Sequence, residues 1–285
     1  MTANPRAIRR QLGNTTVTAL CDGYLEPPFG ALLGIEEADA AALLRQAFRQ
    51  PSPRSNINAF LVQSPGRTVL IDTGAGSSMG TTMGRLPDAL AEAGVTPGDI
   101  GAVLMTHLHI DHWGGLATPD GQAAFPNAEL VLPAAEAAYW LDSARTAEAP
   151  DGAAKARFTG AQAAVAPYRN RMRSFAGTDV LPGIQAVPLP GHTPGHTGYL
   201  VEGDEPLLIW GDVMHVQDVQ APRPEVGVRF DSDPEAAITS RRRVLDMAAA
   251  DRLLVAGMHL HFPAFSHVAR AAEGYALVPD LWAAE

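Results

Sequence analysis

The stretch THLHIDHWGG, residues 106–115, constrains this chain more than any other feature. It holds three of the nine histidines of the chain and one aspartate, at His107, His109, Asp111 and His112. The stretch follows the apolar run AVLM, which predicts that a buried strand delivers these side chains into a turn. Imidazole and carboxylate groups that converge in this way suit zinc or another divalent transition metal. The fold must therefore bring a metal site to the end of a strand.

Metal-binding side chains also follow three later strand patterns. The segments are PLPGHTPGHTG with His192 and His196, LLIWGDV with Asp212, and LLVAGMHLHFP with His259 and His261. Loops at strand ends commonly carry the binding residues of a protein. We therefore expect these segments to meet the first cluster at one site.

The apolar pattern predicts an α/β fold. Strands are expected at 15–23, 58–74 (a hairpin), 100–107, 128–133, 184–190, 197–203, 206–212 and 252–257. Helices are expected at 36–48, 86–95, 134–142 and 233–249, the last with Asp233 as its N-cap. Strand runs interrupted by helices in both halves favour stacked sheets with helices outside. No composition shift marks a boundary, so we expect one domain over 1–285, with a partly helical surface insertion at about 143–178.

Charge and composition narrow the class of partner. The chain has 31 acidic and 21 basic residues and a net charge of −10, which argues against nucleic acid and anionic membrane surfaces. Its one cysteine, Cys21, excludes an intrachain disulfide. No apolar run fits a signal peptide or a membrane span. These features predict a cytoplasmic protein with a small-molecule substrate, and they leave a homodimer open.

The motifs, in this order, resemble those of the metallo-β-lactamase fold hydrolases. The match consists of H-x-H-x-D-H, then G-H-T-P-G-H, then G-D after an apolar strand, and a late Gly-x-His. The segment LIDTG, residues 70–74, is similar to an early strand and turn of that family. The resemblance extends from about residue 15 to 280. It implies an αβ/βα sandwich of two mixed β-sheets with outer helices, and a metal site at one edge of the sheets.

The resemblance also implies two divalent metal ions, with zinc preferred and manganese, cobalt or iron(II) as alternatives. The implied ligands are His107, His109 and His192 for one ion, Asp111, His112 and His259 for the other, and Asp212 as the bridge between them.

Three further residues have implied places around these ligands. His261 competes with His259 for the last ligand position, and His259 is preferred because it directly follows the residues GM. Asp72 would orient the loop that carries the first cluster, as carboxylates behind metal ligands do. In the motif G-H-T-P-G-H the first histidine is the ligand, which leaves His196 behind the metal site.

The implied chemistry is hydrolysis. A hydroxide that bridges two metal ions would attack a carbonyl or phosphorus, and Asp111 could pass a proton to the leaving group. The segments VRFDSDPEAA and GMHLHFPAFSHVARAAEGYALVP resemble the branch of acyl-homoserine lactonases and methyl parathion hydrolase. His215 stands three residues after Asp212, where the lactonases have a tyrosine that contacts the substrate carbonyl. It either donates a hydrogen bond to substrate or supports Asp212 from behind.

Our leading hypothesis is a dinuclear hydrolase of small esters or lactones, with phosphotriesters as additional substrates. The alternatives are a mononuclear iron persulfide dioxygenase, a glyoxalase II-like thioesterase, and a metal-binding domain without catalysis. Trp113 and Phe262 are expected to line the substrate pocket, which the loops 24–56 and 143–178 would shape.

Other motifs are given structural interpretations. Trp140, Phe265 and Trp282 are assigned to the core. Ser78 in GSSMG fits the serine-esterase elbow G-x-S-x-G but does not directly follow a strand, so a serine mechanism is discounted. The run SRRRV, residues 240–244, is interpreted as a solvated helix face.

Overall fold

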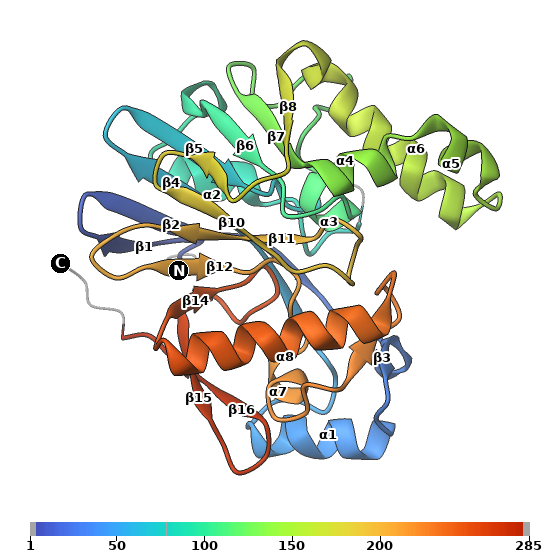
Figure 1. Ribbon diagram of the computed structural model, residues 1–285, viewed down its shortest axis with the longest axis vertical. Helices are drawn as coiled ribbons and strands as arrows, with labels where there is room; N and C mark the ends of the chain where they lie inside the picture. The colour runs from blue at the N-terminus through green and yellow to red at the C-terminus, as the bar shows by residue number, and fades with distance from the viewer. Residues whose placement is uncertain (1–3, 78, 282–285) are drawn as a thin grey trace.

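Two seven-stranded mixed sheets lie against each other in the computed structural model, which describes residues 4–77 and 79–281 (Figure 1). The first sheet has the order β1-β2-β4-β5-β6-β7-β8, with strands at Ala7–Leu12, Thr15–Leu25, Ser55–Ser64, Arg67–Ile71, Ala102–Leu104, Glu129–Pro133 and Met172–Phe175. The second sheet contains β9 to β12 and β14 to β16, at Asp179–Leu181, Ile184–Pro188, Thr197–Val201, Leu207–Ile209, Leu254–Ala256, Ser266–Arg270 and Tyr275–Pro279.

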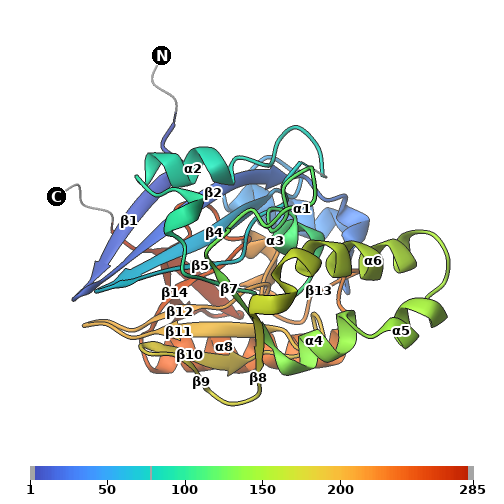
Figure 2. The same cartoon turned by 90° about the horizontal axis from the view of Figure 1, so that it is seen from above.

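Helices cover the outer faces of both sheets. Figure 2 shows α2 (Leu86–Glu92) over the first sheet and α8 (Pro234–Ala250) on the far side of the second. The side chain of Asp233 accepts a hydrogen bond from the Ala236 amide, so its predicted role as the N-cap of α8 is confirmed. The predicted αβ/βα sandwich is likewise confirmed.

Strand β4 shows why the apolar runs of this chain form strands that are buried on both faces. Phe60 and Val62 point into the core between the sheets, whereas Ala59 and Leu61 pack in the cluster under α2. Successive side chains of a strand alternate between its faces, so a strand covered on both sides needs a continuous apolar run. The segment NAFLV meets that requirement.

A separate small core lies beside the second sheet. Strand β3 (Leu32–Leu33) pairs with β13 (Gly227–Val228), and α1 (Glu37–Gln46) and α7 (Gln217–Gln220) pack around them. Buried side chains from both chain segments form this satellite core: Leu32, Ala40, Leu44, Val216, Val219, Val226 and Val228. The segment from β3 to α1 is thereby packed against the chain that follows β12.

The expected surface insertion is only partly a surface feature. After α4 (Ala134–Trp140), the chain forms α5 (Ser143–Glu148), α6 (Ala153–Val165) and a 3-10 turn at Ala166–Arg171. Tyr168 in that turn is fully buried, and its hydroxyl donates to the Leu116 carbonyl at 2.9 Å. The chain then enters the first sheet as β8.

Some interpretations from the sequence change with the structure. The run SRRRV is not wholly solvated, because Arg241 is only 1 % exposed. Its guanidinium donates to the carbonyls of Val213, Pro224 and Val226 and so holds the loop after β12. Trp140 and Phe265 are buried as expected, while Trp282 and Ser78 lie outside the described residues. No described helix has the length and apolar character needed to cross a membrane.

Candidate metal centre

Parallel strand pairs bring the polar strand ends to one edge of the fold. Strands β5 and β6 are parallel, as are β12 and β14. The loops after β6, β12 and β14 carry His107, Asp212 and His259 respectively. The short helix α3 (Ile110–Trp113) follows at once and presents Asp111 and His112 on its first turn. The loop between β10 and β11 adds His192.

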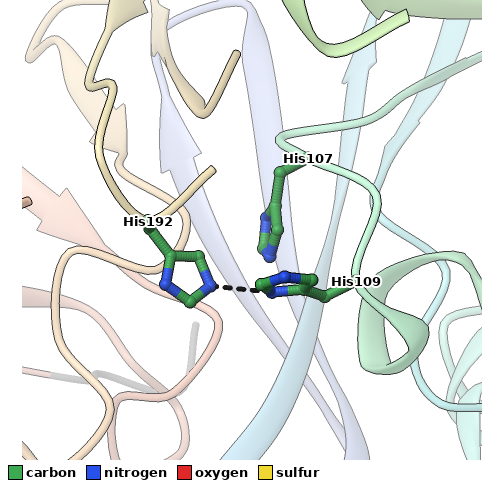
Figure 3. A group of neighbouring side chains, drawn as sticks. All are labelled: His107, His109 and His192. Carbon is green, nitrogen blue, oxygen red and sulfur yellow. Dashed lines mark hydrogen bonds between the residues drawn. The ribbon is translucent and has the colours of Figure 1, made fainter. Parts of the chain in front are cut away.

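The structure gathers these side chains into overlapping groups. Figure 3 shows His107, His109 and His192 pointing toward one another, with His109 Nδ1 2.9 Å from His192 Nε2. Within each group the potential ligand atoms all lie within 4.8 Å of one another, and the groups are His107–His109–His192, His107–His112–Asp212, Asp111–His112–His259 and His192–Asp212–His215.

Asp212 lies at the centre of the cluster. Its Oδ2 atom is 3.0 to 3.6 Å from the Nε2 atoms of five imidazoles, which belong to His107, His112, His192, His215 and His259. Burial alone would raise the pKa of Asp212, but the nearby His112, His259 and His107 hold it well below its usual value. Asp212 is therefore an ionised carboxylate that faces nitrogen atoms on several sides.

Several buried atoms of the cluster make no hydrogen bond within the described part of the chain, and this fits a bound metal ion. They include Nε2 of His107, Nε2 of His112 and Oδ1 of Asp212. Buried polar atoms normally have a hydrogen-bond partner, and each exception needs an explanation. Burial and the neighbouring histidines hold the pKa of His107 and of His109 well below the usual value, so both rings are neutral and have a lone pair to offer. The residues present thus fit divalent cations.

Fixed acceptors orient three of the imidazoles. Nδ1 of His112 donates to Asp72, Nδ1 of His192 to Asp231, and Nδ1 of His259 to the Asn56 carbonyl, at 2.7, 2.8 and 2.7 Å. A proton held at Nδ1 leaves Nε2 free as a ligand atom. Burial opposes protonation of His192, yet its hydrogen bonds with Asp212 and Asp231 raise its pKa to about 9, so a metal ion that binds Nε2 would displace a proton. Sequence reasoning did not identify Asp231 or Asn56.

Asp72 and His196 lie behind the ligands, where the resemblance places them. Asp72 also accepts hydrogen bonds from the amide and hydroxyl of Thr106, at 2.8 and 2.7 Å, and so ties the end of β6 to His112. His196 accepts from the Asp212 amide at 2.9 Å and donates to the Leu189 carbonyl. Burial and the nearby His192 lower the pKa of His196 to about 3, which keeps it a neutral acceptor.

Glu136 on α4 joins the two loops that carry the three-histidine group. It is fully buried and accepts hydrogen bonds from the Leu108 amide at 2.8 Å, the Thr193 hydroxyl at 2.7 Å and the Gly195 amide at 2.9 Å. The indole of Trp140 donates to it as well. Sequence reasoning missed Glu136, although one signal was available: it is the only charged residue in the otherwise apolar helix AAEAAYW.

His215 covers Asp212 and also faces the substrate side. Its Nε2 is 3.2 Å from Asp212 Oδ2, and its ring stacks on His259. The side chain lines the cavity beside the cluster, and its buried Nδ1 has no partner among the described residues. Burial lowers the pKa of His215 to about 4, so the ring is neutral. The side chain thus contacts Asp212 and also lines the cavity.

His261 lies apart from the cluster. Its Nε2 is 2.6 Å from Asp218 Oδ2, whereas His259 Nε2 lies 3.5 Å from Asp111 Oδ2 and 3.0 Å from Asp212 Oδ2. His259 therefore lies in the cluster, and His261 does not.

A cavity of about 410 Å³ opens onto the cluster. Residues from both loops expected to shape the pocket line it, including Leu25 and Leu32 from 24–56 and Arg157 from 143–178. Trp113 lines the cavity as expected. Phe262 does not, which corrects that expectation: its ring packs against the main core between the sheets instead.

Comparisons with known proteins agree with this geometry. A family model of the metallo-beta-lactamase superfamily matches residues 52–259. The crystal structure of AbOPH, a hydrolase in the beta lactamase superfamily, is 30 % identical and has a TM-score of 0.93 over 99 % of this chain and 100 % of that chain. AidC, a dizinc quorum-quenching lactonase solved with a homoserine product, is 24 % identical and shares the fold, with a TM-score of 0.89 over 98 % of each chain.

Relatives with a described activity include N-acyl homoserine lactonases. An N-acyl homoserine lactonase from Bacillus sp is 27 % identical over 174 residues, which is 60 % of this chain and 60 % of the lactonase. The chain thus aligns with about three fifths of the length of that relative.

Proposed function

This chain belongs to the metallo-beta-lactamase superfamily, and from that premise we propose that it hydrolyses small esters or lactones with two divalent metal ions, zinc by preference. Its relatives and structural neighbours are metallo-hydrolases, so the open question is the substrate. The observation that carries the proposal is a complete set of His and Asp ligands on the floor of an apolar cavity.

The groups of side chains suggest which side chains would bind each of the two ions. In our assignment the bridge is Asp212, one ion takes the three-histidine group His107–His109–His192, and the other takes Asp111–His112–His259. The buried atoms of His107, His112 and Asp212 that lack partners would then all be used.

The chemistry divides between the ions and the chain. Two bound cations would supply a water of lowered pKa and polarise the oxygen of the bond under attack. Asp111, whose Oδ2 lies 3.5 Å from His259 Nε2, lines the cavity and would pass a proton to the leaving alkoxide. The imidazole of His215 would donate a hydrogen bond to the substrate oxygen as negative charge develops there.

The cavity supports a substrate with an apolar body next to the bond that is cleaved. Its walls beyond the cluster are mainly apolar, and they include Leu25, Leu32, Val216, Val228 and Phe230. A volume of about 410 Å³ is within the range of small-molecule sites. Such walls suit the acyl part of an ester or lactone, and a neutral phosphotriester could enter the same space as an additional substrate.

Metal analysis and a substrate panel test the proposal together. The metal content of the protein is measured as purified, and the purified and zinc-loaded forms are assayed with lactones, aryl esters, phosphotriesters, β-lactams and a thiol persulfide. We expect two ions per chain and the highest turnover with lactones or esters. One iron per chain, with oxygen consumption on a persulfide, would instead identify the dioxygenase.

The variant Asp212→Ala serves as the matched control. It removes the shared ligand and leaves two cations facing each other without a carboxylate between them. We expect less than two ions per chain and near-complete loss of hydrolysis. Unchanged metal content and turnover would remove Asp212 from the site.

A further inference from the structure

The cavity has one charged side chain that the metal cluster does not explain. Among the residues that line it, Asp111 and Asp212 belong to the cluster, and most of the others are apolar. Arg157 on α6 is the exception, because it places a guanidinium in the lining away from the strand ends that carry the ligands. The cavity therefore has a metal-binding floor, apolar walls and a cation on a separate element.

Helix α6 is held against the cavity by close packing. A Cβ atom on Gly160 would lie 2.9 Å from Cη2 of Trp113, so the helix approaches α3 as closely as a glycine permits. Ala153, Ala156 and Arg157 lie seven, four and three residues before Gly160 on the same side of the helix, and all three line the cavity. The position of Arg157 is thus set by the packing of the helix.

Arg157 has no carboxylate partner in the described chain. It takes part in none of the ion pairs there, whereas Lys155 in the same helix pairs with Asp151 at 3.0 Å. Arg157 is solvent-exposed, which places it where the cavity opens to water. Its planar fork of donors can therefore bind an incoming carboxylate with two parallel hydrogen bonds.

We propose that Arg157 is a specificity residue that binds an oxyanion, such as a carboxylate, on the end of the substrate remote from the bond that is cleaved. This inference rests on the proposed function and deepens it. The substrate is an ester or lactone with its reactive carbonyl at the metal cluster, an apolar middle along the walls and an anionic group at the mouth of the cavity.

A pair of matched esters tests the proposal. The zinc-loaded protein is assayed with 4-nitrophenyl hexanoate and with the mono-4-nitrophenyl ester of adipic acid, which differ mainly in a terminal carboxylate. The measured quantity is the ratio of kcat/KM for the anionic ester to that for the neutral ester. Arg157→Met keeps the apolar stem and removes the charge, so we expect this ratio to fall about twofold to fivefold, mainly through KM.

Two further variants define the controls. Arg157→Glu reverses the charge and should lower the ratio further. Arg169→Met removes an exposed arginine from the turn after α6, outside the cavity, and should leave the ratio at the wild-type value. High salt should also lower the wild-type ratio, because it screens an exposed pair. A ratio that Arg157→Met does not change would overturn the proposal, as would an equal effect of Arg169→Met.

Binding separates this proposal from the proposed function. Adipate is titrated calorimetrically into the zinc-loaded wild type, Arg157→Met and Arg169→Met. Weaker binding to Arg157→Met alone supports the oxyanion site even if no ester is hydrolysed, an outcome that would refute only the proposed function. Equal affinity for all three proteins, or no binding to any, would refute the role of Arg157.

Discussion

His215 is in contact with Asp212 and with the cavity at the same time, so its two roles can be separated by substitution. His215→Ala should keep both metal ions and lower turnover by roughly 10²–10³, the effect of losing one well-placed donor to a developing oxyanion. His215→Tyr should retain much of the lactone hydrolysis, since a phenol can make the same hydrogen bond. Metal analysis and kcat for one lactone provide the readout. If both variants lose metal or fail to fold, the side chain only supports Asp212.

Glu136 is a second residue whose substitution should affect one metal site more than the other. Glu136→Gln replaces a carboxylate oxygen with an NH₂ group that faces donors, so the loops carrying His107, His109 and His192 should separate. We expect roughly 10- to 100-fold weaker metal binding at this three-histidine site, with the other site less affected. Titration of the metal-free protein with cobalt, followed by its absorption bands, measures each site.

The control for Glu136 is another glutamate beside the same sheet. Glu129→Gln disrupts a partly exposed ion pair with Arg173 and should leave both metal affinities unchanged. Equal weakening of the two sites in Glu136→Gln would mean that Glu136 supports the fold as a whole and has no particular role at the three-histidine site.

At the C-terminus of α1, one residue has a backbone conformation that is unfavourable for its type. Phe48 lies at φ +60°, in the position of a helix-ending motif that glycine usually occupies, and it is 97 % exposed. The amides of Phe48 and Arg49 bond the carbonyls of Arg45 and Leu44, as that motif requires. Phe48→Gly should raise the free energy of unfolding by about 0.5–1 kcal/mol, because relief of the left-handed conformation outweighs the added chain entropy.

Urea denaturation of two variants checks this prediction. Phe48→Ala removes the same exposed ring but keeps the strained backbone, so it should bring no gain. If alanine stabilises the protein as much as glycine does, the exposed ring and not the backbone is responsible.

The elements that sequence could predict are those with strong apolar patterns. Strand β4 and the strands that precede the metal ligands are continuous apolar runs, and each was expected at its place. In the two large sheets, strands β1, β8, β9, β15 and β16 were missed. They lie toward the sheet edges, and their residues are largely exposed or half-buried, as in β16, so their sequences lack a clean period of two.

At the scale of the whole molecule, the candidate site also has residues that a local sequence motif reveals and residues that only the fold brings into place. The clustering of the His and Asp side chains could be predicted because short motifs place several of them within a few residues. Asp231 and Glu136 could not, because Asp231 reaches His192 across 39 residues and Glu136 reaches Thr193 across 57. Only the packed fold determines which of the many carboxylates in the chain faces these loops. The cavity, built from α6 and the satellite core together, was predicted only as two loop ranges.

Because the ligands come from both sheets, metal ions should stabilise the whole molecule. Asp212 and His259 belong to the second sheet, and His107 and His112 follow strands of the first, so a bound ion connects the two. Ions that bind only the folded state add about 4 kcal/mol per site at a thousandfold excess over Kd, which should raise Tm by on the order of 10 °C for two sites. Chelation of the zinc-loaded protein should remove this gain, and added zinc should restore it. Asp212→Ala, which lacks the shared ligand, should show a clearly smaller shift by calorimetry. A Tm that does not change when metal analysis shows the ions have been removed would contradict this prediction, because it would mean that the ions do not prefer the folded chain.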